Sequence, residues 1–88
     1  MMFVILSYDV GQARVSKLSK ISKKYLHPVQ RSLFEGHLSD LLLNKLKKEL
    51  FTCIDTEKDS IVFYKFSSAS EVSVDKLGIQ RSESRGII

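Results

Sequence analysis

The feature that most constrains the fold of this chain is the order in which its hydrophobic period changes. Residues 3–8 form a nearly continuous apolar run, and residues 60–66 are rich in β-branched and aromatic side chains, which is typical of strands buried in a sheet. Residues 12–26 and the stretch that follows Ser39 instead repeat apolar side chains at helical spacing, with charged side chains on the remaining faces. This alternation predicts a domain in which strands and helices pack in layers.

The two predicted helices carry signals at their ends. We expect the first helix to close at about Leu26, because the residue before Pro28 is disfavoured in the helical conformation. Ser39 suits the N-cap of the second helix, and Asp40 is favourable in its first turn. Cys53 falls in the apolar stripe of the second helix, so we interpret it as a small core residue rather than a nucleophile.

The remaining extended segments are less well determined. Residues 29–38 form either one long strand or two short strands with a kink. Residues 72–77, in which Val72 and Val74 alternate with serines, predict a weaker strand at the edge of the sheet. The order strand, helix, strand or strands, helix, strand, strand is most simply packed as a two-layer α/β plait, with two helices on one face of a mostly antiparallel sheet.

Such a plait leaves the second face of its sheet without a cover, so we expect a homodimer that covers it through that face or through a sheet edge. A chain of 88 residues supports one modest core and buries only roughly 60–65% of its unfolded surface, which favours a site shared between two copies. We assign residues 1–78 to the domain. Residues 79–88 form a C-terminal tail, which we expect to pack on the partner protomer or on a partner protein because it ends in two isoleucines.

The distribution of charge is more informative than its total. The net charge is +4, and six of the 14 basic residues lie between Arg14 and Arg31, whereas Asp9 is the only acidic residue before Glu35. The basic side chains of the first helix could neutralise phosphates of a nucleic acid, or they could form an ordinary solvated helix face. A single cysteine and the lack of an apolar run of about 20 residues lead us to expect a cytoplasmic protein with no membrane partner.

Asp9 is the first candidate for chemistry, because it ends the predicted central strand just before the basic helix. A carboxylate there could hold Mg²⁺, which proteins bind through one or two carboxylates together with waters and substrate phosphates. One aspartate makes a poor site, but two brought together by a dimer axis make a plausible one. The alternative is that Asp9 caps the helix that follows.

A second candidate site is the segment from Gln30 to Gly36. The side chains of Arg31 and Ser32 could contact phosphate oxygens, and the ring of Phe34 could stack on a base. The alternative is an ordinary strand in which Phe34 is buried. The two histidines, His27 and His37, have no metal-ligand spacing with each other or with the cysteine.

Taken together, these segments resemble the CRISPR-associated endoribonuclease family, the smaller of the two universal CRISPR adaptation proteins. The resemblance runs from about Met2 to Gly78 and rests on the order and spacing of several motifs. They are the strand ending in Tyr8-Asp9-Val10, the basic helix, Val29-Gln30-Arg31-Ser32-Leu33-Phe34-Glu35-Gly36, the amphipathic helix, Ile54-Asp55 and Asp59-Ser60-Ile61-Val62-Phe63-Tyr64. The chain departs from the family at Pro28, where relatives often carry an arginine.

The resemblance implies a ferredoxin-like fold and a homodimer that takes part in spacer acquisition together with the larger adaptation integrase. It implies a metal-dependent endoribonuclease or endonuclease that uses Mg²⁺, with Mn²⁺ as an alternative, on single-stranded RNA or double-stranded DNA. Other family members act as non-catalytic DNA-binding scaffolds. Asp9 matches the metal-binding aspartate of the family, with Tyr8 beside it as a further catalytic candidate. The expected nucleic-acid-binding residues are Arg14, Lys17, Lys20, Arg31, Ser32 and Phe34.

Overall fold

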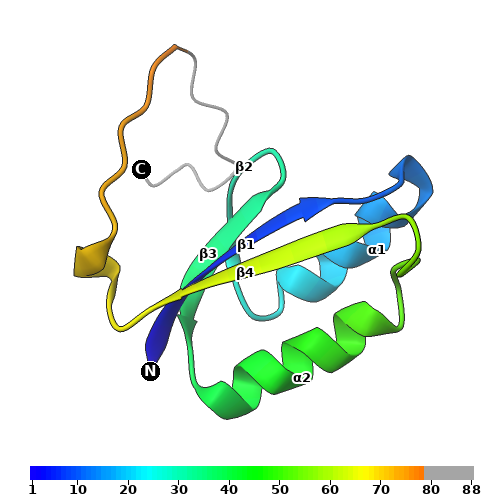
Figure 1. Ribbon diagram of the computed structural model, residues 1–88, viewed down its shortest axis with the longest axis horizontal. Coiled ribbons are helices and arrows are strands. Elements are labelled where there is room, and N and C mark those ends of the chain that lie inside the picture. The colour runs from blue at the N-terminus through cyan, green and yellow to red at the C-terminus, as the bar shows by residue number, and fades with distance from the viewer. Residues whose placement is uncertain (79–88) are drawn as a thin grey trace.

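The strand β1 (Met2–Asp9) lies inside a four-stranded sheet, as its apolar sequence predicts (Figure 1). A computed structural model describes residues 1–78 of the chain. The sheet order is β2-β3-β1-β4, and each neighbouring pair of strands is antiparallel. The other elements are α1 (Gln12–Ser22), β2 (His27–Gln30), β3 (Leu33–Leu38), α2 (Asp40–Phe51) and β4 (Ser60–Phe66). This arrangement confirms the predicted ferredoxin-like α/β plait.

The core lies between the sheet and the two helices. On β1 the side chains of Val4 and Leu6 point toward the helices, where they meet Leu18 of α1 and Leu46 of α2; all four have 0% of their surface exposed. Burying each such side chain contributes roughly 1.5–3 kcal/mol. The predicted N-cap is confirmed, because the side chain of Ser39 accepts a hydrogen bond from the backbone N–H of Leu42, the third residue of α2. Within residues 1–78, neither helix has the length and apolar character needed to cross a membrane.

The first helix ends earlier than predicted. It stops at Ser22, and the backbone N–H groups of Tyr25 and Leu26 both donate to the Ser22 carbonyl, so the chain turns tightly there. The turn brings Leu26 back into the core, where it is 2% exposed. Gly36 of β3 makes room for it, because a Cβ at Gly36 would stand 3.0 Å from a methyl carbon of Leu26. The packing of Leu26 therefore accounts for a helix that ends earlier than Pro28 alone would require.

The segment 29–38 contains two strands rather than one. A hairpin joins β2 to β3, and its turn residue Ser32 has a φ of 68°, in the left-handed region that non-glycine residues seldom occupy. The Ser32 carbonyl accepts a hydrogen bond of 3.1 Å from the backbone N–H of Tyr8. This bond attaches the hairpin turn to the carboxyl end of β1.

Both α1 and α2 lie on one face of the sheet, and the opposite face, which no helix of residues 1–78 covers, is here called the open face (Figure 1). On β4, Ile61 and Phe63 pack against the core, so Val62 and Tyr64 must point to the open face, and they are 42% and 51% exposed. The predicted edge strand at 72–77 is wrong, because this segment has no strand structure and follows a short 3-10 helix, η1 (Ala69–Glu71).

The apolar side chains of the 72–77 segment are used differently from the prediction. Val72 and Val74 line a cavity of about 430 Å³ together with Phe3 and His37 of the open face. The start of the segment therefore borders the open face instead of pairing along an edge of the sheet, whereas Leu77 farther along is 96% exposed. The predicted packing of the tail 79–88 lies outside the described residues.

Candidate nucleic-acid and metal site

Asp9 lies at the end of β1 on the same side as the open face. Side chains alternate along a strand, and because Val4 and Leu6 point to the helices, Ile5, Ser7 and Asp9 point the other way. The Asp9 side chain is exposed, and within residues 1–78 it makes no hydrogen bond or ion pair. The capping alternative is wrong, because the N-cap of α1 is Gly11 and no side chain caps this helix.

The fit of this residue to a metal ion depends on a second carboxylate. The described part of the chain holds no group of three or more histidine, cysteine, aspartate or glutamate side chains that could bind a metal. Mg²⁺ in proteins is bound through as few as one or two carboxylates, with water and phosphate oxygens as its other ligands. Asp9 fits this chemistry as one half of a site, and a second copy of the chain would supply the other half.

A second aspartate, Asp59, stands at the start of the same helix and is used in the opposite way. Its side chain has 0% exposure and accepts hydrogen bonds on both oxygens. Oδ1 accepts from the Gly11 backbone N–H at 2.9 Å and from Arg14 Nη2 at 2.8 Å. Oδ2 accepts from Arg14 Nε at 2.5 Å and from the Asp55 backbone N–H at 2.8 Å. We call Gly11, Arg14, Asp55 and Asp59 the clip.

The clip restricts which residue fits at position 11 and lowers the pKa of Asp59. A Cβ at Gly11 would lie 2.4 Å from Arg14 Nη2, so any larger residue there would require the guanidinium to shift from its position on Asp59. The hydrogen bonds and charge of Arg14, helped by the two backbone N–H groups, outweigh burial and hold the pKa of Asp59 far below its ordinary value. Sequence reasoning missed Asp59, because a lone aspartate in a polar turn gives no sign of partners 45 and 48 residues away.

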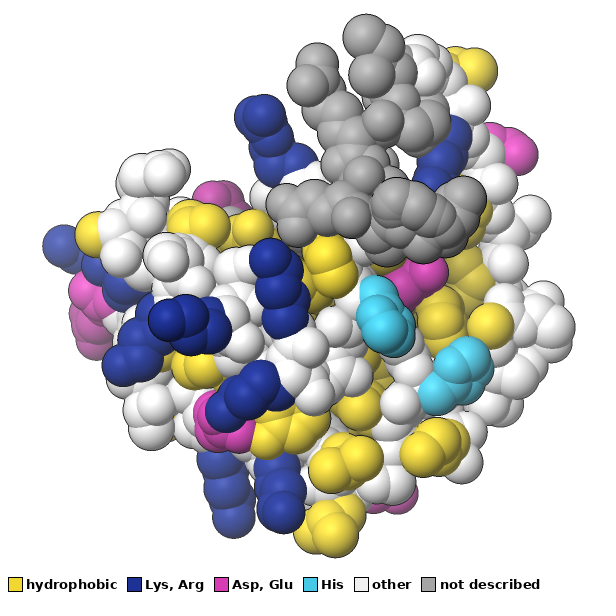
Figure 2. All heavy atoms as spheres, turned by 180° about the vertical axis from the view of Figure 1, so that it is seen from behind, with side chains coloured by type: hydrophobic (Ala, Val, Ile, Leu, Met, Phe, Trp, Pro, Cys, Tyr) yellow, Lys and Arg dark blue, Asp and Glu magenta, His cyan; other side chains and the backbone are white. Residues whose placement is uncertain are grey.

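Of the basic residues predicted on α1, two remain available to a ligand. Arg14 donates Nε and Nη2 to Asp59, so its charge is balanced within the chain. Lys17 and Lys20 are exposed, and neither makes an ion pair in the part of the chain that the structure describes. Lys24 forms an ion pair with Glu49 of α2 at 2.5 Å. Figure 2 shows lysine and arginine side chains spread over the left and middle of the face seen from behind, apart from a hydrophobic area at lower right.

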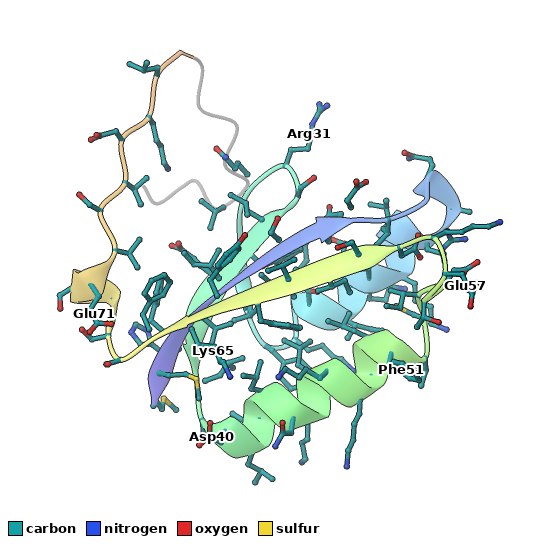
Figure 3. The ribbon with its side chains drawn as sticks, in the orientation of Figure 1. Arg31, Asp40, Phe51, Glu57, Lys65 and Glu71 are labelled. Atoms are coloured by element: carbon teal, nitrogen blue, oxygen red, sulfur yellow. The ribbon has the colours of Figure 1, made fainter. Side chains whose placement is uncertain are left out.

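The other predicted residues come together on the helix side of the hairpin. Tyr8, Arg31, Ser32 and Phe34 all line one cavity of about 360 Å³ between α1 and the β2–β3 hairpin. Arg31 is exposed and extends away from the hairpin tip (Figure 3), whereas Phe34 is only 3% exposed, as the ordinary-strand alternative expected. The predicted site is therefore divided into Asp9 at the end of the open face, the lysines of α1, and this cavity.

Comparison with known proteins agrees with this geometry. Residues 2–74 match the family model described as CRISPR associated protein Cas2. The "CRISPR-associated endoribonuclease Cas2" of Thermotoga maritima is 43% identical over 82 residues, which cover 93% of this chain and 94% of that protein. The "CRISPR-associated endoribonuclease Cas2 3" of Thermodesulfovibrio yellowstonii is 39% identical and covers 100% of both chains. The crystal structure of Streptococcus pyogenes Cas2 at pH 6.5 is similar with a TM-score of 0.78 and 31% identity, over 89% of this chain and 100% of that one.

Proposed function

Because this chain belongs to the CRISPR associated protein Cas2 family, we propose that it is a nucleic-acid-binding homodimer of CRISPR spacer acquisition that cleaves phosphodiester bonds with Mg²⁺ held by the Asp9 carboxylates of two copies. The observation that carries this proposal is the position of Asp9. Its carboxylate is exposed, has no partner within residues 1–78 and lies on the face of the sheet that no helix covers. A carboxylate kept free in this way is available to a cation.

The open face supports the homodimer. Val62 and Tyr64 expose 42% and 51% of their surface there, and Ile5 and Leu33 add further apolar surface on the neighbouring strands. Apolar area of this kind is stabilised when a second copy covers it, and a two-fold axis brings the same patch of each copy together. Because Asp9 shares this face, a dimer formed here would place both carboxylates between the two sheets.

In this proposal metal binding, phosphate binding and positioning of the strand end are carried out by different residues. Asp9 of each copy would hold Mg²⁺, with Mn²⁺ as an alternative, and the bound ion would polarise a phosphate and lower the pKa of its water. Lys17 and Lys20 would bind backbone phosphates as point charges. The N–H of Tyr8, bonded to the Ser32 carbonyl, keeps the end of β1 in place. The substrate would be single-stranded RNA or double-stranded DNA.

A second candidate function is a non-catalytic scaffold that holds DNA for the larger adaptation integrase. The observation that favours it is the exposure of Lys17 and Lys20, which are placed to bind phosphate without any contribution from Asp9. The two functions therefore differ in their need for one carboxylate.

The test is a cleavage assay with and without Mg²⁺ or Mn²⁺, from about pH 6 to 9, comparing the wild type with Asp9→Asn. We expect the substitution to reduce metal-dependent cleavage by roughly 100-fold or more. Because Asp9 has no partner in the described chain, the melting temperature should stay within about 2 °C of the wild type. Unchanged cleavage by Asp9→Asn would remove Asp9 as the metal ligand, and a wild type that cleaves nothing under these conditions while binding DNA would favour the scaffold.

A further inference from the structure

The outer side of α2 carries two large apolar side chains that no part of residues 1–78 covers. Leu41 and Phe51 are 67% and 68% exposed, near opposite ends of this 12-residue helix. Figure 1 shows α2 along the lower border of the molecule, and Figure 3 shows Phe51 at its carboxyl end. The inner side of the same helix packs in the core through Leu43, Leu46 and Leu50. The helix α2 thus has apolar side chains on its outer side as well as on its inner side.

The spacing of the exposed residues on α2 is that of a helix–helix contact. Leu41, Asn44, Lys48 and Phe51 follow one another at intervals of three, four and three residues, and we call these four residues the outer seam. Side chains at this spacing form one continuous line along a helix, on which a second helix can pack. All four are exposed. With a rise of about 1.5 Å per residue, the two apolar ends stand roughly 15 Å apart along the helix axis, which matches a helical partner of about three turns.

Lysine side chains give the outer seam a positive charge. Lys48 belongs to the seam and Lys45 lies beside it; both are exposed, and neither makes an ion pair within residues 1–78. The nearby carboxylate of Glu49 accepts hydrogen bonds from Lys24 and Tyr25, so it is already in use. Charged side chains that flank an apolar line between helices select a partner of the opposite charge. The outer seam therefore favours a partner with carboxylates.

The combination of charge and apolar surface indicates a protein partner. The phosphates of a nucleic acid would pair with the lysines but would leave Leu41 and Phe51 in water, whereas a helix can cover both. Large apolar and aromatic side chains that become covered supply most of the binding energy of protein contacts. A second copy of this chain would bring the same lysines to the contact, where like charges repel. The matching surface is a helix with apolar side chains at both ends of its contact line and carboxylates beside them.

We propose that the outer seam of α2 binds an acidic amphipathic helix of a partner protein, whose apolar side chains cover Leu41 and Phe51. The carboxylates of the partner pair with Lys45 and Lys48. Asn44 lies between the two apolar ends, and a polar residue within a helix–helix contact fixes the register of the two helices. The outer seam is separate from the open face and from α1, so this inference goes beyond the proposed function and does not depend on it.

The test measures the binding of a designed, fluorescein-labelled helical peptide of about 18 residues by anisotropy, without metal or nucleic acid. The peptide carries leucines at the spacing of the outer seam with glutamates beside them, and its control carries lysines in place of the glutamates. We expect a dissociation constant on the order of 10–100 µM for the acidic peptide and binding at least roughly tenfold weaker for the basic one. Equal binding of the two peptides, or no binding of the acidic peptide at about 1 mM, would overturn the proposal.

Two variants of α2 locate the peptide on the outer seam. Leu41→Gln/Phe51→Gln removes both apolar ends and should weaken binding of the acidic peptide by roughly 10-fold or more. Lys45→Gln/Lys48→Gln should weaken it by roughly three- to tenfold and should make the remaining affinity less dependent on salt. All four positions are exposed, so the melting temperatures should stay within about 3 °C of the wild type. Unchanged affinity in both variants would place the peptide elsewhere and overturn the proposal.

A matched control on α1 separates this contact from net charge and from nucleic-acid binding. Lys17→Gln/Lys20→Gln also removes two exposed lysines, and its affinity for the acidic peptide should stay within about twofold of the wild type. The affinity of Lys45→Gln/Lys48→Gln for a DNA duplex of about 20 base pairs should likewise stay within about twofold, whereas the proposed function expects the α1 control to bind the duplex more weakly. An equal loss of peptide binding in the α1 control would show that only net charge is recognised. Duplex binding that falls as far in the α2 variant as in the α1 control would assign the α2 lysines to nucleic acid, and either result would overturn the proposal.

Discussion

Asp9 and Asp59 stand at the two strand ends that adjoin the start of α1, and the molecule uses them in opposite ways. Asp9 and Ser60 are directly paired between β1 and β4, so the two aspartates belong to neighbouring positions of the sheet. The Asp59 side chain is fully buried and accepts four hydrogen bonds, whereas Asp9 is exposed and accepts none from the described chain. The first carboxylate stabilises the turn, and the second remains available to a ligand from outside.

The difference shows how a small domain can hold a charged site without a deep pocket. The clip holds the β1–α1 turn against the loop before β4, so the backbone that follows Asp9 is fixed at Gly11. A carboxylate with four donors has little capacity left for a cation, which leaves Asp9 for that role. The predictions below test this division, from the largest expected effect to the smallest.

The largest effect should be on the mass of the protein in solution, when residues of the open face, on which Asp9 also lies, are substituted. If a second copy covers the open face, the protein in solution should have twice the chain mass of 10.0 kDa by light scattering. The double variant Val62→Asp/Tyr64→Asp places charges on this face and should shift the mass to that of one chain, because burying unpaired charges is strongly unfavourable. Lys65→Asp is the matched control, since Lys65 lies on the same strand but alternates to the other side (Figure 3). A wild type of single-chain mass at micromolar concentration would exclude the shared metal site.

The next effect distinguishes Asp59 from Asp9 by the melting temperatures of their asparagine variants. Asp59→Asn keeps the shape of the side chain but removes the charge that pairs with Arg14, leaving the guanidinium without its partner. We expect the melting temperature to fall by roughly 10 °C; the 30% exposure of the Arg14 side chain keeps the loss below that of a fully buried ion pair. Asp9→Asn should change it by no more than about 2 °C. Equal melting temperatures for the two variants in calorimetry would contradict the structural role of the clip.

A smaller effect follows from the pKa of Asp59. The pKa in the folded state lies below the ordinary value of 3.8, mainly because of the hydrogen bonds from Arg14, so the unfolded chain takes up a proton first as pH falls. The stabilisation by this carboxylate is fully present above about pH 4 and is lost as pH falls further toward the folded-state pKa. The melting temperature of the wild type should therefore decline below pH 4 more steeply than that of Asp59→Asn.

A control is needed because a second carboxylate among residues 1–78, that of Glu49, also has a lowered pKa. Glu49 accepts hydrogen bonds from Lys24 and Tyr25, and these lower its pKa. Glu49→Gln should keep most of the acid-dependent decline, since this pair is much more exposed than the clip. If Glu49→Gln removes the decline and Asp59→Asn does not, the acid sensitivity belongs to the contact between α2 and the turn that follows α1.

These comparisons also show which parts of the molecule local sequence can predict. The strands β1 and β4 and the helix α2 follow from runs and periods within a few residues, and the cap at Ser39 follows from one side chain. The end of α1 was predicted four residues late, because it depends on Leu26 packing where Gly36 lacks a side chain. The edge strand at 72–77 was wrong because alternation alone cannot tell whether a partner strand is present.

The sequence did not predict how the candidate site residues are divided among separate parts of the structure. Asp9, Lys17 and Lys20 are exposed as a ligand site requires, and Tyr8, Arg31, Ser32 and Phe34 share one cavity. The role of Arg14 was not foreseeable, because its partner Asp59 lies 45 residues away and nothing near either residue indicates the pair. Long-range pairs of this kind are determined by tertiary packing, which a local pattern does not contain.

The smallest predicted effect tests whether Arg14 or the lysines of α1 bind phosphate. Each phosphate contact adds roughly 0.7 to 0.9 to the slope of log affinity against log salt. Lys17→Ala/Lys20→Ala should flatten this slope by roughly one unit or more per protomer, because two exposed charges without ion pairs in the described chain are lost. Arg14→Ala/Asp59→Asn removes a neutral pair as a unit and leaves the net charge unchanged, so its slope should stay within about 0.3 of the wild type when measured well below its melting temperature. A slope flattened by a full unit in this second variant would mean that Arg14 contacts phosphate through Nη1 while Asp59 holds the rest of its guanidinium, and the clip would then belong to the nucleic-acid site itself.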